Sequence, residues 1–103
     1  MTIKKAPLFE RLEKKYGELT FANTLKAWRD ADEMSQVAFA KRLGISTQNL
    51  NDIEKGRRIP SPKRAARIAK KLGIPDIAFV MLSVRDSLRK EGFDYKVSLK
   101  DAS

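Results

Sequence analysis

The sequence contains no cysteine and no histidine. Their absence excludes disulfides, zinc fingers, thiol nucleophiles and serine–histidine–aspartate sites. A chain without cysteine also fits a reducing compartment. We expect no cofactor, no metal and no enzymatic activity. The Ser-x-x-Lys spacing of Ser87 and Lys90 is common by chance, and no other feature of the sequence supplies a cleft around it.

Long apolar segments are also missing. No apolar run approaches the roughly 18 residues that span a membrane, and the N-terminal stretch lacks the apolar region of a signal peptide. We therefore expect a cytoplasmic protein without membrane contact. The 103 residues, 42% of them hydrophobic, suffice for one domain with a single modest core.

Positive charge is abundant and unevenly placed. The net charge is +9, and residues 33–73 hold ten basic and three acidic side chains, whereas residues 74–103 hold five of each. Such an excess favours a polyanionic partner through counterion release and electrostatic steering. Three of these cations, Arg67, Lys70 and Lys71, are expected to be solvated only.

Residues 35–55 predict two short helices joined by a tight turn. Ser35 and Ser46 are good N-cap residues, and Gly44 suits the left-handed residue that ends a helix. The apolar positions at helical spacing are Phe39, Ala40, Leu43, Leu50 and Ile53. Because one residue separates Gly44 from Ser46, the helices must cross steeply. This pattern is typical of a helix-turn-helix, whose second helix enters the major groove of DNA.

Further helices are predicted on both sides of this segment. They span residues 7–16, 21–32, 62–72 and 76–91. The last helix is apolar nearly all round in its first half, which favours a subunit interface, with an unusually thick core as the alternative.

The tail after Gly92 alternates apolar and polar residues and predicts a short strand. A lone strand must pair. The candidate partners are the same tail of a second protomer, which we rank first, residues 2–4, or a strand of another protein. The predicted dimer interface consists of Ile77, Val80, Met81, Val84, Leu88, Phe93, Tyr95, Val97 and Leu99.

Residues 21–73 resemble the XRE family of helix-turn-helix domains, to which the lambda phage repressor belongs. The resemblance rests on LKAWR, SQ-x-x-FA-x-x-LGIS, L-x-x-IE-x-G-x-R-x-PS and IA-x-x-LGI. It implies an all-α fold, a compact five-helix lambda-repressor-like DNA-binding domain over residues 21–91 with the helix-turn-helix at 35–55. An N-terminal extension with a short helix (1–20) and a strand-like C-terminal tail (92–103) would be added to it.

The resemblance also implies roles for single residues. Base edges would be read by Thr47, Gln48, Asn51 and Asp52. DNA phosphates would be bound by Ser35, Gln36, Ser46, Asn49, Lys55, Arg57, Arg58, Lys63 and Arg64. Arg29 and Glu54 fall where phage repressors of this family have a buried ion pair. The sequence departs from the family at Val37 and Ala38, where relatives usually carry polar or acidic residues.

The expected function is that of a homodimeric, sequence-specific regulator that binds double-stranded DNA, most simply a repressor located at the nucleoid. The alternative is an antitoxin of a type II toxin–antitoxin pair, which represses its own operon and holds a toxin through the tail or the N-terminal helix. A protein-bridging module that reads no bases is a third reading. Retention of Gln36, Gln48 and the arginine loop argues against it.

Overall fold

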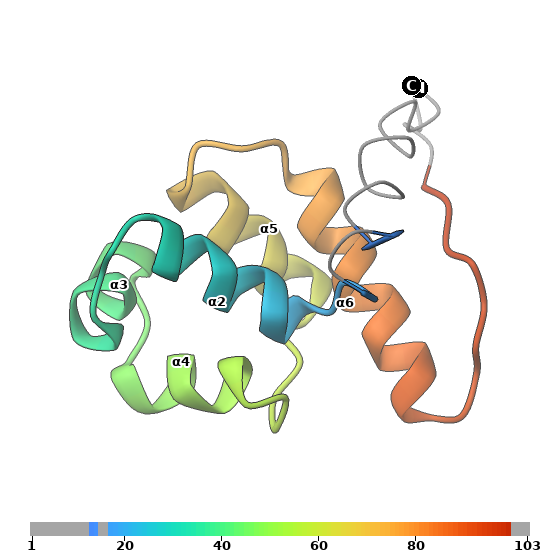
Figure 1. Cartoon of the computed structure of the whole chain (residues 1–103). Coiled ribbons are helices and arrows are strands. Elements are labelled where there is room, and N and C mark those ends of the chain that lie inside the picture. Colours follow the sequence, from blue (N-terminus) through green and yellow to red (C-terminus); the bar gives the residue numbers. More distant parts are fainter. Residues whose placement is uncertain (1–12, 15–16, 100–103) are drawn as a thin grey trace.

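In the computed structural model of the chain, residues 13–14 and 17–99 are described. Within these ranges the structure contains five helices and no strand (Figure 1). The helices are α2 (Phe21–Ala31), α3 (Gln36–Leu43), α4 (Thr47–Glu54), α5 (Pro62–Lys71) and α6 (Asp76–Lys90). The predicted all-α class with a five-helix domain is therefore confirmed.

The two predicted additions to that domain have different outcomes. The helix predicted at residues 7–16 lies almost entirely outside the described residues. The predicted C-terminal strand is wrong, because residues 93–99 have no regular structure. A strand needs a neighbouring backbone to satisfy its amides and carbonyls, and no described segment supplies one. In place of a strand, the alternating apolar residues Phe93 and Tyr95 stack on each other, with ring centroids 5.8 Å apart.

Local signals in the sequence fix where the helices begin and end. Each of α2 to α5 begins at a hydroxyl that accepts a hydrogen bond from the backbone amide three residues later. These caps are Thr20, Ser35, Ser46 and Ser61, and each stabilises its helix by about 1 kcal/mol. Gly44 ends α3 with φ +72°, a conformation in which a side chain would be strained. This glycine permits the tight turn between α3 and α4.

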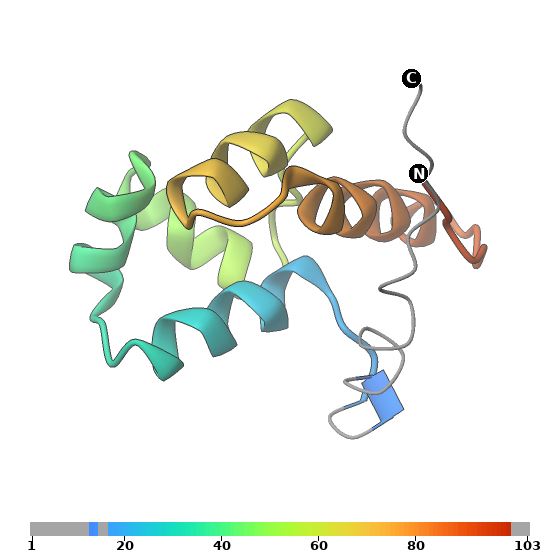
Figure 2. The same cartoon turned by 90° about the horizontal axis from the view of Figure 1, so that it is seen from above.

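The core joins all five helices. Leu25 of α2 and Leu50 of α4 are fully buried. Phe79 of α6 makes edge-to-face contacts with Phe21 and Trp28, at centroid distances of 5.1 and 6.5 Å. Helix α5 packs along α6, and α2 contacts both α4 and α6 (Figures 1 and 2). The scaffold therefore supports α4 from one side and leaves its other face open.

Helix α6 is covered by its own chain more than its composition predicts. Phe79 and Leu82 belong to the core, and Met81, assigned to a dimer interface by the sequence, is only 8% exposed. The other four α6 residues of the predicted dimer interface, Ile77, Val80, Val84 and Leu88, stay half-buried. Ser83 is buried because its hydroxyl donates to the carbonyl oxygen of Pro60 over 2.6 Å.

Candidate nucleic-acid interface

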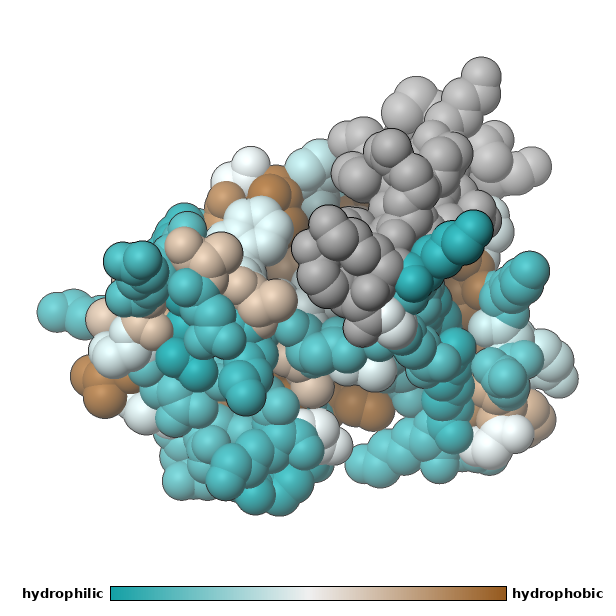
Figure 3. All heavy atoms as spheres, viewed as in Figure 1, coloured by the Kyte–Doolittle hydropathy of each residue, from teal (hydrophilic) through white to brown (hydrophobic). Residues whose placement is uncertain are grey.

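Helix α4 divides its residues between the core and the open face. Leu50 and Ile53 are 0% and 3% exposed and anchor the helix. Thr47 and Gln48, three and two positions before the first anchor, are exposed, and Asn51 and Asp52 are half-buried one turn later. Figure 3 shows that the surface over α4 is largely hydrophilic. The four predicted base-reading residues thus lie on the side of α4 away from its two anchors.

Asp52 is the centre of a hydrogen-bonded cluster on that face. Its Oδ1 accepts from Gln48 Nε2 over 3.1 Å and from Arg57 Nε and Nη2 over 3.0 and 2.9 Å. Hydrogen bonding from Arg57 lowers the pKa of Asp52 below its ordinary value. The sequence did not reveal this cluster, because Arg57 lies beyond the helix and reaches back to it only through the loop conformation. Gln48, Asp52 and Arg57 therefore form one preassembled group.

A second cluster fixes α4 to α2 and α3. Arg29 donates from Nε and Nη2 to the two carboxylate oxygens of Glu54, over 2.8 and 3.0 Å. Gln36 Nε2 donates to Glu54 over 3.2 Å and to Asn51 Oδ1 over 3.4 Å. The Glu54 side chain is 3% exposed. Burial raises the pKa of Glu54, but the hydrogen bonds from Arg29 and Gln36 outweigh that effect, so the net pKa lies below its ordinary value.

The amide of Gln36 therefore has partners within the protein. The residue lies at the start of α3, where the sequence predicts a phosphate contact, yet its side chain is oriented by Glu54 and Asn51. This arrangement links a predicted phosphate contact to a predicted base contact. Helical spacing in the sequence could not predict this hydrogen bond, because Gln36 and Asn51 are fifteen positions apart and lie on different helices.

The remaining predicted phosphate contacts cluster around the α3 and α4 starts and the loop after α4. Ser35 and Ser46 act as helix caps, so the first turns of both helices present their amides beside them. The exposed cations are Lys55, Arg57, Arg58, Lys63 and Arg64. Arg57 is paired with Asp52; the other four make no ion pair within residues 13–14 and 17–99. Their charge is therefore available to an anionic partner.

Other classes of site receive no support from the described residues. In that part of the chain no group of acidic side chains could hold a metal ion. None of its helices is both long and apolar enough to cross a membrane.

Comparison with known proteins places this geometry in a family. The helix-turn-helix family model matches residues 25–77, from the middle of α2 to the start of α6. An uncharacterised HTH-type transcriptional regulator of Methanocaldococcus jannaschii is 44% identical over 52 residues, which cover 50% of this chain and 79% of that protein. The ImmF control region 10 kDa protein of Bacillus phage phi105 is 33% identical over 81 residues, covering 79% of this chain and 83% of the relative.

No solved structure matches the chain. The family model nevertheless covers both helices of the motif, the loop that carries the unpaired cations, and α5. The chain belongs to the XRE-type helix-turn-helix family of DNA-binding transcriptional regulators.

Proposed function

We propose that this protein is a homodimeric repressor that reads a specific sequence in the major groove with α4. The observation that carries the proposal is the position of α4, whose anchors Leu50 and Ile53 are buried while Thr47 and Gln48 are exposed. Unpaired cations follow the same helix on the loop after it and at the start of α5. The face of α4 proposed to read bases thus lies beside a surface that attracts phosphates.

Base reading is assigned to the open face of α4. The Gln48 amide can bond adenine in a bidentate manner, and Thr47 can bond a base or contact a thymine methyl. Asn51 can also bind adenine, and Asp52 can accept from the amino group of cytosine. Because Asp52 already holds Gln48 and Arg57, it limits the orientations in which the glutamine meets a base.

Phosphate binding is assigned to the helix starts and the loop. The amides at the N-termini of α3 and α4, with Gln36, Ser35 and Ser46 beside them, suit phosphate oxygens. The cations after α4 add contacts that carry no sequence information but raise affinity and its salt dependence. Together they would hold the α4 helix in one orientation on the duplex.

A homodimer would give the regulator its second half-site. Half-buried apolar residues follow one another along α6 at Ile77, Val80, Val84 and Leu88, and the exposed rings of Phe93 and Tyr95 follow the helix. A two-fold dimer uses the same patch on both subunits, and an inverted-repeat operator mirrors that symmetry. The phi105 relative, a control-region protein by name, favours a role in genetic control and hence a nucleoid location.

One observation supports an antitoxin as the second candidate function. The Phe93 and Tyr95 side chains are 46% and 61% exposed on a segment without regular structure, which suits a partner protein that pairs with the tail. In that case the tail would hold a toxin and α4 would still bind the operon's DNA.

The test is selection of binding sites from a random duplex library with the purified protein alone. Enriched inverted repeats with half-sites about 10 base pairs apart are expected from a self-sufficient dimeric regulator. Folded protein that enriches no sequence would contradict the repressor proposal and favour partner-dependent binding. Sedimentation of the same preparation measures the oligomeric state independently.

A further inference from the structure

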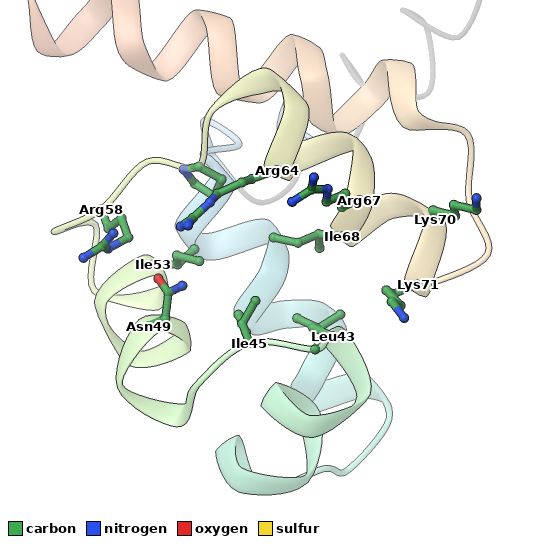
Figure 4. Close-up of a pocket in the computed structure, with 12 residues that line it drawn as sticks. Leu43, Ile45, Asn49, Ile53, Arg58, Arg64, Arg67, Ile68, Lys70 and Lys71 are labelled. Atoms are coloured by element: carbon green, nitrogen blue, oxygen red, sulfur yellow. The ribbon is translucent and has the colours of Figure 1, made fainter.

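A groove of about 400 Å³ separates the turn of the helix-turn-helix from α5 (Figure 4). Its floor is apolar and comes from Leu43 and Ile45 at the turn, Ile53 of α4 and Ile68 of α5. Leu43, Ile53 and Ile68 are core residues, so the floor is held by the packing of the domain. The volume falls in the range of small-molecule sites, roughly 300–1,000 Å³.

Every charged residue on the rim of this groove is basic. These cations are Arg58, Arg64, Arg67, Lys70 and Lys71, and they stand beside the uncharged Asn49 and Pro60. None of these five cations forms an ion pair with any described residue. In Figure 4, Arg58 lies at one end and Lys70 and Lys71 at the other, with Arg64 and Arg67 on α5 between them. Five like charges around one groove repel one another, and a bound anion would relieve that repulsion.

We infer that this groove binds a small organic anion with an apolar body. The anionic head, a carboxylate or a phosphate, would lie on the guanidinium groups of Arg64 and Arg67, whose planar forks suit either group. The apolar body would cover Ile45. A DNA phosphodiester would contact the basic rim but not the apolar floor, because a polar sugar–phosphate chain gains little from contact with isoleucine.

Binding of such a ligand would oppose DNA binding. Arg58 and Arg64 belong both to the rim and to the cations proposed to contact DNA phosphates. An anionic head on Arg64 occupies one of these cations directly and lowers the positive potential around Arg58, so ligand and DNA each weaken the other by the same factor. This coupling rests on the proposed DNA-binding function, whereas occupancy of the groove does not.

The experiment uses full-length protein with isoleucine methyl groups labelled for NMR. The probes are octanoate and octyl phosphate, and the controls are octanol, acetate and inorganic phosphate at equal concentrations. We expect the two amphipathic anions to shift the methyl signals of Ile45, Ile53 and Ile68 saturably while Ile77 on α6 stays unchanged. Affinity for the controls should be at least about tenfold weaker, because octanol lacks the charge-assisted contact while acetate and inorganic phosphate lack the apolar body. Equal shifts with octanol or inorganic phosphate, or none with any probe, would overturn the inference.

A double variant separates the groove from the DNA interface. Arg67→Gln with Lys71→Gln removes two rim cations outside the proposed phosphate set and should weaken octanoate binding by about tenfold. The matched control, Lys26→Gln with Lys90→Gln, removes two exposed lysines that do not line the groove and should bind the probe as the wild type does. Equal loss in both variants would mean general electrostatic attraction and would overturn the site.

DNA affinity is then measured with and without the probe. Octanoate should weaken operator binding by the wild type and weaken it less in the Arg67, Lys71 double variant. If the protein binds no DNA but its isoleucine signals shift, the proposed DNA-binding function is wrong and the inferred ligand site in the groove is still supported. If a saturating concentration of octanoate leaves the DNA affinity unchanged, the proposed competition between ligand and DNA is wrong.

Discussion

Helices α4 and α6 divide their residues between core and surface differently. Helix α4 has eight residues, of which Leu50 and Ile53 are buried, and the rest of its surface is polar. Helix α6 has fifteen, and its buried residues include two polar ones, Ser83 and Arg85, while apolar side chains such as Val84 stay half-exposed. A polar outer face with few anchors suits a nucleic-acid partner. Apolar surface left over after folding suits a protein partner.

The same contrast appears in two carboxylates. Glu54, at the end of α4, has a lowered pKa because Arg29 and Gln36 donate to it and outweigh its burial. Asp86, on α6, has a raised pKa because burial outweighs the hydrogen bond it accepts from the backbone amide of Phe21. Since the two groups shift in opposite directions, acid acts differently on the two regions of the molecule.

The largest effect is expected from removing an anchor of α4. Leu50 is fully buried, so Leu50→Ala should lower the free energy of unfolding by about 3 kcal/mol through lost burial and a cavity. Tyr95→Ala, on the exposed tail, should change it by less than about 0.5 kcal/mol. Urea denaturation measures both variants. Similar losses in the two would show that the tail belongs to the folded core.

Breaking the Arg29–Glu54 pair should come next. The side chains of Arg29 and Glu54 are 15% and 3% exposed, and Arg29→Ala leaves the carboxylate without its main partner. We expect a loss of about 3 kcal/mol at neutral pH, measured by urea denaturation. Lys41→Ala on the exposed surface of α3, a cation without an ion pair to any described residue, is the matched control and should be close to neutral.

The pH dependence of stability sharpens the comparison of the two carboxylates. The folded-state pKa of Glu54 lies below its ordinary value of 4.5. Its stabilisation is therefore present above that value and lost as the pH falls through the folded pKa. For Asp86, whose folded pKa lies above 3.8, stability instead rises as the pH falls from the folded pKa toward 3.8. Glu54→Gln should reduce the acid-induced loss and Asp86→Asn should remove the gain; unchanged profiles would contradict these assignments.

Replacing the proposed base-reading glutamine tests the open face of α4. Gln48→Ala should cost about 1–3 kcal/mol on the selected operator and relax preference at one base position. Thermal unfolding should be nearly unchanged, because Gln48 is exposed. Binding to the operator with unaltered affinity and preference would mean that another face of the domain reads the DNA.

A smaller effect, seen in the salt dependence, is expected around Asp52. Arg57→Ala should weaken binding to all sequences alike and lower the slope of log affinity against log salt by about one. Asp52→Asn frees Arg57 and should do the opposite, raising affinity for unrelated DNA while reducing discrimination. Titrations at several salt concentrations distinguish them. An Arg57→Ala variant with unchanged affinity and salt slope would exclude a phosphate-binding role for Arg57.

The smallest effect on folding is expected from truncation before Phe93. Residues 93–99, the described part of the removed segment, have no regular structure, so urea denaturation under monomeric conditions should change little. Sedimentation should show weaker dimerisation if the tail lies in the interface. A dimer of undiminished affinity would assign Phe93 and Tyr95 to a different partner.

The sequence by itself determined the helical part of this protein. Hydroxyl caps at Thr20, Ser35, Ser46 and Ser61 and the glycine at position 44 are local signals, and local hydrogen bonds and backbone freedom set helix ends. The periodic apolar residues determined which face of α2 to α5 is buried, since a helix in water buries its one apolar side. The placement of Leu50 and Ile53 in the core followed from the same rule.

Tertiary structure alone decided how the surface groups are combined. Asp52 meets Arg57, and Gln36 meets both Asn51 and Glu54, because loop and helix positions bring distant residues together. The tail shows the converse: its alternating pattern predicts a strand, but a strand forms only where another backbone accepts its hydrogen bonds. Local propensity acts within a few residues of the chain, whereas pairing, burial and charge clusters depend on which segments the fold places side by side.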